Sequence, residues 1–163
     1  MGDLAQVFEF VMDNEDAGRS GAITTGPDGR TQWGISEEYN PGAHYPMTLA
    51  EAQAIYVAKY FDPFHVADIR DQGVANLVGD FMVNPGPEEG GRLIQQAVNM
   101  LYPGALEVDG HVGPVTVSRL NGCVPSDLLP RLRAQRALFY VNDTEAHPER
   151  AKFLMGWLVR ACR

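Results

Sequence analysis

The stretch that decides the fold runs from residue 3 to residue 36 and reads DLAQVFEFVMDNEDAGRSGAITTGPDGRTQWGIS. Apolar side chains recur at helical spacing through residues 3–14, which predicts an amphipathic helix there. The glycine-rich remainder contains a strong turn signal at residues 26–29, Gly-Pro-Asp-Gly. Residues 22–25 and 31–36 flank that turn and suit short strands. The stretch therefore predicts a helix followed by a small β-hairpin.

Helical spacing of apolar residues recurs along the rest of the chain. Residues 48–51, Thr-Leu-Ala-Glu, form a capping box that predicts a helix start, and Pro114 and Pro148 suit first helical positions. We find no internal repeat, low-complexity segment or long linker. The sequence predicts a mainly α (α+β) fold, with residues 1–163 as a single domain of several helices around the hairpin.

The composition narrows the class of protein. The chain has 163 residues, of which 45% are hydrophobic and 21% charged, as in ordinary globular proteins. Its net charge of −8 disfavours nucleic acid as a partner, because nonspecific DNA binding depends on neutralising phosphates. No apolar run approaches the roughly 20 residues of a membrane-spanning helix. We therefore expect neither a nucleic-acid partner nor a membrane span.

Cysteine and histidine patterns give little support to metal or thiol chemistry. Cys123 and Cys162 are too few for a disulfide scaffold, and we expect two free thiols. The histidines are scattered and no His-Glu-x-x-His or Cys-x-x-Cys pattern occurs, so we predict no metal site and no cofactor. A thiol dyad of Cys123 with His111 or His147 stays open as a nucleophilic alternative.

Glu15 is the strongest candidate for catalysis. It lies where the predicted helix ends, and the negative end of the helix dipole favours its protonated form. A general acid needs such a proton, although most glutamates at helix ends are simply solvated. The facing hairpin carries Asp28 and Thr31, so the region has the acid and opposing polar groups that glycoside hydrolysis requires.

Three aromatic residues near the hairpin are candidates for sugar binding. Trp33, Tyr39 and Tyr45 offer flat faces on which sugar rings stack. Aromatic side chains of this kind serve equally well as core packing, and that alternative stays open for each.

Motifs along the chain resemble those of one enzyme family. Residues 14–18, Asn-Glu-Asp-Ala-Gly, and residues 29–36, Gly-Arg-Thr-Gln-Trp-Gly-Ile-Ser, resemble the Glu-Gly-Gly and Gly-Gly-x-Thr-x-x-Gly-Ile-Ser/Thr signature of glycoside hydrolase family 108. That family comprises peptidoglycan-cleaving N-acetylmuramidases, many of them phage endolysins. Further similar motifs follow in the family's order, so that the resemblance spans about residues 8–160. These motifs lie at residues 55–61, 79–86, 93–97, 108–116 and 156–160.

The resemblance implies a fold and a set of site residues. It implies a lysozyme-like helical domain in which residues 1–87 resemble the catalytic region and residues 88–163 a peptidoglycan-binding region. Glu15 matches the family's catalytic acid, and Thr31 matches a group that positions water or substrate. Thr24 stands where the family often has aspartate, so Asp28 is the candidate second carboxylate, and the alternative is that no second carboxylate is needed.

Two polar residues of the motif at residues 79–86 are further candidates for substrate contact. Asp80 and Asn84 lie in or at the end of a helix with an apolar stripe. A buried hydrogen-bonding or capping role is the alternative for each of them.

We therefore expect a monomeric, lysozyme-type N-acetylmuramidase that cleaves the β-1,4 bond between N-acetylmuramic acid and N-acetylglucosamine in bacterial peptidoglycan. One alternative is a non-catalytic cell-wall glycan-binding or structural virion protein that kept the fold. Asp16 points that way, because the family usually has glycine after the acid. Another alternative is a relative that degrades chitin or chitosan.

The N-terminal residues bear on where such an enzyme would act. Residues 1–4, Met-Gly-Asp-Leu, lack the basic region and apolar core of a signal peptide. We therefore expect synthesis in the host cytoplasm and action in the periplasm or cell wall. Release by a holin, delivery by a virion or injection would each bring the protein there.

Overall fold

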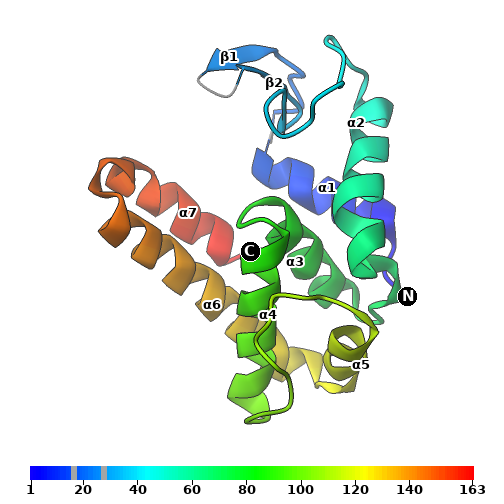
Figure 1. The fold of residues 1–163 in the computed structure, drawn as a ribbon, viewed down its shortest axis with the longest axis vertical. Helices are drawn as coiled ribbons and strands as arrows, with labels where there is room; N and C mark the ends of the chain where they lie inside the picture. Colours follow the sequence, from blue (N-terminus) through cyan, green and yellow to red (C-terminus); the bar gives the residue numbers. More distant parts are fainter. Residues whose placement is uncertain (16–17, 27–28) are drawn as a thin grey trace.

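The N-terminal part of the chain forms a helix and a three-stranded antiparallel sheet in this computed structural model, which describes residues 1–15, 18–26 and 29–163 (Figure 1). Helix α1 (Leu4–Glu15) precedes strands β1 (Thr24–Gly26), β2 (Gly29–Gln32) and β3 (Ile35–Ser36). The register pairs Thr24 with Thr31 and Thr31 with Ser36. The predicted helix and hairpin are confirmed. The single strand expected over residues 31–36 is wrong, because a turn at Trp33 and Gly34, both with positive φ, divides that stretch into the end of β2 and strand β3.

Helix α2 (Leu49–Tyr56) begins at the predicted capping box. The Thr48 hydroxyl accepts a hydrogen bond from the Glu51 backbone N–H at 3.2 Å, and the Glu51 carboxylate accepts one from the Thr48 N–H at 2.7 Å. The helix continues as a π-helical turn, Val57–Phe61, and then breaks into 3-10 turns at Asp62–Phe64 and Val66–Asp68. Turns of the π type often occur at functional sites, and this one lies beside the cleft described below.

The C-terminal part of the chain is helical. Helix α3 (Gln72–Val83) is followed by α4 (Pro87–Leu101), α5 (Pro114–Gly122) and the long α6 (Pro125–Ala146). A 3-10 turn, Pro148–Phe153, then leads into α7 (Leu154–Ala161), which runs back along α6 (Figure 1). The helices α4, α5 and α6 each begin with proline, which suits a position where the backbone N–H has no partner inside the helix.

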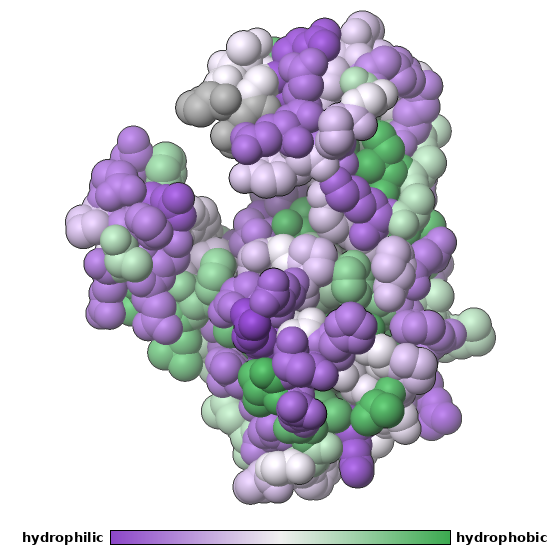
Figure 2. Space-filling view, viewed as in Figure 1, coloured by the Kyte–Doolittle hydropathy of each residue, from purple (hydrophilic) through white to green (hydrophobic). Residues whose placement is uncertain are grey.

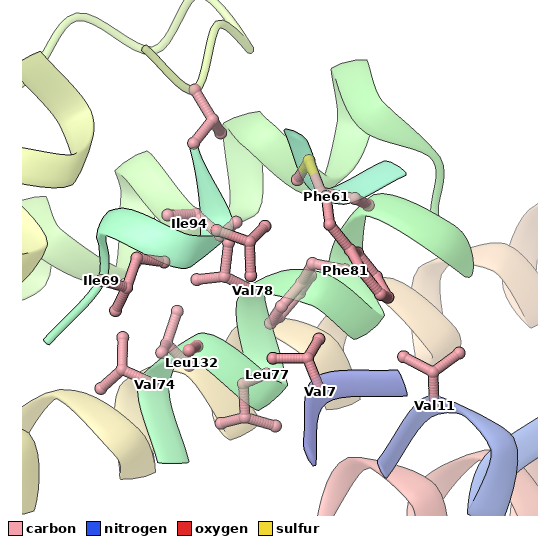
Figure 3. Packing of buried hydrophobic residues seen from close by; sticks show 14 of the residues in the cluster. Val7, Val11, Phe61, Ile69, Val74, Leu77, Val78, Phe81, Ile94 and Leu132 are labelled. Atoms are coloured by element: carbon pink, nitrogen blue, oxygen red, sulfur yellow. The ribbon is translucent and has the colours of Figure 1, made fainter. Parts of the chain in front are cut away.

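The core centres on α3, which packs against α1, α4 and α6. Figure 3 shows side chains from these helices meeting: Val7 and Val11 from α1, Leu77, Val78 and Phe81 from α3, Ile94 from α4 and Leu132 from α6. Each of these side chains is almost fully buried, which contributes roughly 1.5–3 kcal/mol per residue. The mainly α, lysozyme-like fold expected from the sequence is confirmed.

Helices α1 and α3 approach closely because residue 79 is glycine. A β-carbon at Gly79 would lie 2.3 Å from Cγ1 of Val7, well inside van der Waals contact. This close approach fixes the direction of α1, and therefore the position of Glu15 at its C-terminal end.

Two further expectations concern the whole chain. Cys123 is buried and Cys162 exposed, and both are free thiols, as expected. Within the ranges that the structure describes, no helix is long and apolar enough to cross a membrane.

Candidate active site

A cleft of about 760 Å³ opens between the sheet, α2 and the junction of α3 with α4. Figure 2 shows the surface hollowed between the sheet at the top and the outer ends of α6 and α7 at the left, although no residue of these two helices lines the cleft. Five segments line the cleft: the end of α1, the β2–β3 turn with β3, the turn after the sheet, the end of α2 with the π-helical turn, and the α3–α4 junction. The lining residues are Glu15, Gly34, Ser36, Tyr39, Asn40, Tyr56, Lys59, Tyr60, Val83, Asn84, Pro85, Gly86 and Pro87.

Glu15 enters the cleft from the last position of α1, and the backbone of Gly34 lies against it. Gly34 has φ of +74°, which favours glycine, and a β-carbon there would lie 3.2 Å from Cβ of Glu15 and 2.5 Å from the Tyr56 hydroxyl. That hydroxyl donates to the carbonyl of Trp33 at 3.0 Å. A glycine at residue 34 therefore lets the sheet approach the acid.

Glu15 is paired with an arginine from the C-terminal helix. Nη2 of Arg160 lies 2.7 Å from Oε1 of Glu15 and 2.6 Å from Oδ1 of Asp80. The Glu15 side chain is 21% exposed and that of Arg160 is 11% exposed, so this pair is largely shielded from water. In the described ranges, Oε2 of Glu15 has no hydrogen-bond partner in the protein, which leaves that oxygen available to a ligand.

Asp80 also holds a second arginine. Both Asp80 and Arg136 are fully buried, and Nη2 of Arg136 forms an ion pair with Oδ2 of Asp80. Burial lowers the pKa of Arg136 to about 10, which leaves it charged at neutral pH. We call Glu15, Asp80, Arg136 and Arg160 the ion cluster. Its two carboxylates and two guanidinium groups balance, as buried charges must.

A chain of hydrogen bonds leads from the ion cluster back to the cleft. Nε of Arg136 donates to the Tyr140 hydroxyl at 3.1 Å, and that hydroxyl donates to Oδ1 of Asn84 at 2.7 Å. The Tyr140 ring stacks on Trp157 of α7 with centroids 5.3 Å apart. Helices α6 and α7 thus support both Glu15 and Asn84, which line the same cleft.

Polar and aromatic groups on the π-helical turn and the neighbouring loop complete the cleft wall. Lys59 Nζ donates to the backbone carbonyl of Tyr39 and, at 3.1 Å, to Oδ1 of Asn40. Burial raises the pKa of Tyr60, and the nearby charge of Glu15 raises it further. Tyr60 therefore stays neutral at physiological pH and can donate a hydrogen bond from its hydroxyl.

The structure brings some of the predicted site residues to the cleft. Glu15, Tyr39 and Asn84 line it, and 62% of Tyr39 is exposed. Thr31 does not line the cleft. It lies directly opposite Ser36 in the sheet, and Ser36 does line the cleft. Residues opposite each other in an antiparallel pair point to the same face, so Thr31 shares the face of the sheet that borders the cleft.

Other predicted site residues have structural roles. Trp33 donates from Nε1 to the carbonyl of Met47 at 3.1 Å, and its ring packs against Gly21. The Tyr45 hydroxyl donates to the carbonyl of Ile35 at 3.0 Å, and neither aromatic residue lines the cleft. Asp80 is fully buried, so it supports Arg160 and Arg136 and does not reach a ligand. Asp28 lies outside the described residues.

Arg160 is the main site residue that the sequence analysis left without a role. It lies in the motif at residues 156–160, far along the chain from Glu15. The signal that could have found it is Asp80, an acidic residue inside an otherwise apolar helix. A buried carboxylate needs a cationic partner, and α6 and α7 supply the arginines that answer it. Ser36, Asn40, Lys59 and Tyr60 of the cleft wall were also missed.

Thiol and metal chemistry find no support in the described ranges. The Cys123 thiol donates to the carbonyl of Arg119 at 3.2 Å, and burial raises its pKa, which disfavours the reactive thiolate. No cluster of three or more His, Cys, Asp or Glu residues suited to a metal occurs among the residues described.

Two family models match consecutive parts of the chain. Residues 8–86 match the model described as Glycosyl hydrolase 108, and residues 89–162 match the one described as Predicted Peptidoglycan domain. The first segment contains Glu15 and Asn84, and the second contains Arg136, Tyr140 and Arg160. The cleft and the ion cluster therefore draw on both matched segments.

A solved structure shares the fold. The structure of Brucella abortus SagA aligns with a TM-score of 0.74, covering 98% of this chain and 90% of that chain at 20% sequence identity. Likeness at this level of identity speaks for the fold alone. No curated relative matches the sequence.

Proposed function

We propose that the chain is an N-acetylmuramidase, because its residues 8–86 match the family model described as Glycosyl hydrolase 108. The two matched models make it a peptidoglycan-related glycoside hydrolase. The proposal adds the bond, which is the β-1,4 linkage between N-acetylmuramic acid and N-acetylglucosamine, and the acid, which is Glu15.

One observation carries the assignment of the acid. Glu15 projects into an open cleft with Oε1 bound by Arg160 and Oε2 without a partner in the described ranges. Glycoside hydrolysis requires a carboxylic acid that protonates the departing glycosidic oxygen. An oxygen that is free of protein partners, on a carboxyl whose other oxygen is fixed by Arg160, can approach the glycosidic oxygen of a bound strand.

The sheet offers hydroxyl groups on the other side of the reacting bond. Thr24, Thr31 and Ser36 are consecutive cross-strand partners, so their side chains form a row on one face of the sheet. Ser36 of this row lines the cleft. We assign to Thr31 the placement of the attacking water, and Asp28, which lies outside the described residues, stays the candidate carboxylate that assists it.

Substrate shape also agrees with the cleft. A glycan strand is a long polymer that enters an open groove from the side, and it presents hydroxyl and acetamido groups alternately along its edges. The exposed Tyr39 ring offers a face for a sugar, while Asn40, Lys59 and Asn84 offer hydrogen-bonding groups. We place the action of the enzyme at the cell wall, which holds this polymer.

The proposal is tested by clearing of purified peptidoglycan, followed as turbidity, with wild type and Glu15→Gln side by side. The amide keeps the shape of the side chain but cannot supply the proton, so we expect clearing to fall at least about 100-fold. Glu9→Gln is the matched control, because Glu9 lies on the same helix and its side chain is 57% exposed.

The outcomes separate the candidate functions. A folded Glu15→Gln protein that clears the wall at the wild-type rate would remove Glu15 from the mechanism. Retained wall binding by a wild-type protein that never clears it would identify the non-catalytic glycan-binding alternative. Clearing of chitin or chitosan in place of peptidoglycan would identify the protein as an enzyme that degrades those polymers.

A further inference from the structure

Asn84 lies at the C-terminal end of α3, where its side chain is exposed at the cleft. Its backbone N–H donates to the carbonyl of Asp80 at 3.0 Å, which fixes the main chain at this point. The side chain makes a hydrogen bond to Tyr140. The orientation of the amide decides what Asn84 offers to a ligand, because an amide oxygen accepts hydrogen bonds and an amide nitrogen donates them.

The Arg136–Tyr140 contact fixes the orientation of the Asn84 amide. A guanidinium nitrogen can only donate a hydrogen bond, so the Tyr140 oxygen accepts from Nε of Arg136 at 3.1 Å. The hydroxyl proton of Tyr140 is then directed to Asn84, where it needs an acceptor, at 2.7 Å. The amide oxygen of Asn84 must therefore face Tyr140, and its nitrogen Nδ2 points away from it.

Tyr140 and Arg136 cannot easily adopt another arrangement. Tyr140 is 2% exposed and stacks on Trp157, and Arg136 is fully buried in its ion pair with Asp80. The amide of Asn84 is thus held by a rigid, buried chain of donors. In the described ranges Nδ2 of Asn84 has no protein partner, so both of its protons are open to the cleft.

Apolar residues adjoin Asn84 along the chain. Val83, Pro85 and Pro87 line the cleft on either side of Asn84. An amide donor beside small apolar surfaces complements a group that combines a carbonyl oxygen with a methyl group. The acetamido substituent of an N-acetylated sugar is such a group, and a free amine, being cationic at neutral pH, is not.

We infer that Asn84 is a specificity-determining residue that donates a hydrogen bond from Nδ2 to the carbonyl oxygen of a substrate acetamido group, and that Tyr140 is the positioning residue that orients it. This inference rests on the proposed function for the identity of the glycan. It assigns to α6, in the segment matched by the second family model, a part in selecting N-acetylated substrate.

The test measures binding of three matched glycan preparations to the Glu15→Gln protein, in which the proposed acid is removed. The probes are peptidoglycan glycan strands, chemically de-N-acetylated strands, and the same strands re-acetylated with acetic anhydride. We expect N-acetylated strands to bind about tenfold more tightly than de-N-acetylated ones, the effect of one hydrogen bond to a neutral group. Re-acetylation should restore the tight binding.

Substitutions then assign that preference to Asn84. Asn84→Asp keeps the shape and the acceptor for Tyr140 but removes the donor, and Asn84→Ala removes both. Each should bind N-acetylated strands about tenfold more weakly. Asn84→Ala should abolish the preference, and Asn84→Asp should abolish or reverse it, because its carboxylate attracts the cationic amine of de-N-acetylated strands. Asn142→Ala is the control, because Asn142 is an exposed asparagine of α6 outside the cleft, and it should keep the preference.

Tyr140→Phe tests the positioning role. Loss of the hydroxyl frees the Asn84 amide to rotate. The preference for N-acetylated strands should therefore fall by about half on a logarithmic scale. Thermal unfolding of the same variant reports any loss of stability. The ratio of the two affinities is the decisive readout, because a purely structural defect weakens both glycans equally. If Tyr140→Phe does not fold, the surface substitution Asn84→Asp alone decides the outcome.

Failure of this inference is distinct from failure of the proposed function. An unchanged preference in Asn84→Ala overturns the inference, even if the wild type cleaves peptidoglycan. A preference that Asn84→Ala abolishes, in a wild type that does not cleave, supports the inference and overturns the proposed activity. Equal binding of both glycans by the unsubstituted cleft overturns the inference directly.

Discussion

The sheet and the helical bundle hold their charged groups in opposite ways. In the sheet region, Arg30 and Glu37 form an ion pair at 2.7 Å whose side chains are 46% and 42% exposed. In the bundle, the pair of Asp80 and Arg136 is fully buried. Exposed pairs contribute little to stability because water and salt screen them. Buried pairs are costly to desolvate, and they persist where their geometry matters.

This difference indicates what each region does. The sheet contributes a face of hydroxyl groups and a backbone that closes on Glu15, for which a few short strands suffice. The bundle fixes the directions of two side chains at the cleft, because Arg160 holds Glu15 and Tyr140 holds Asn84. Catalytic groups must be held to within a fraction of an ångström, and the buried charges of the bundle serve that requirement.

The largest effect on stability is expected from removing the carboxylate of the buried ion pair. Asp80→Asn leaves Arg136 and Arg160 as buried cations without their shared carboxylate. We expect the free energy of unfolding to fall by about 3–5 kcal/mol, measured by urea denaturation. Glu37→Gln removes the carboxylate of the exposed pair and should leave the unfolding midpoint almost unchanged. Equal effects from the two substitutions would contradict the contrast between the regions.

A smaller effect is expected from substituting Arg160, and it is an effect on catalytic activity, not on stability. Arg160→Lys keeps the charge but offers a single ammonium group, which cannot hold Glu15 and Asp80 in the geometry of the guanidinium. We expect kcat for peptidoglycan cleavage to fall about 10- to 100-fold, because the acid is misplaced relative to the bond. Arg150→Lys, on the surface pair with Asp143, is the control. A wild-type kcat in Arg160→Lys would show that Glu15 needs no such support.

The smallest effect concerns acid stability of the sheet region. The Arg30 guanidinium lowers the pKa of Glu37 to about 2 from an ordinary value of 4.5. Since the pKa is lower in the folded state, the stabilisation from this pair is complete above pH 4.5 and is lost as the pH falls towards 2. Thermal unfolding of Glu37→Gln should therefore depend slightly less on pH across that window than wild type. Identical pH dependence would show that the pair adds nothing.

Local patterns in the sequence predicted the elements that surround Glu15. The apolar spacing over residues 3–14 and the glycine-rich turn placed the acid between a helix and a hairpin, because both signals depend on neighbouring residues. The capping box at Thr48 and Glu51 is local in the same sense. The motifs resembling family 108 added the lysozyme-like arrangement of these parts.

The tertiary partners of the site could not be predicted in the same way. Arg160 reaches Glu15 only through the packing of α7 against α6 and of α6 against α3. Trp33 and Tyr45 were predicted to bind sugar for a related reason. The sequence alone does not separate an aromatic ring that binds a sugar from one that packs in the core, because its hydrogen-bond partner is not visible there. In this protein the partners are the backbone carbonyls of Met47 and Ile35.

The most direct test of the central claim is the identity of the new reducing end produced from purified peptidoglycan. Fragments released by wild type are reduced with borohydride and analysed by mass spectrometry, with Glu15→Gln alongside. A muramidase must leave N-acetylmuramic acid at the reducing end, recovered as its alditol, and the mutant must release none. Fragments ending in N-acetylglucosamine, or in cut peptide stems, would contradict the account.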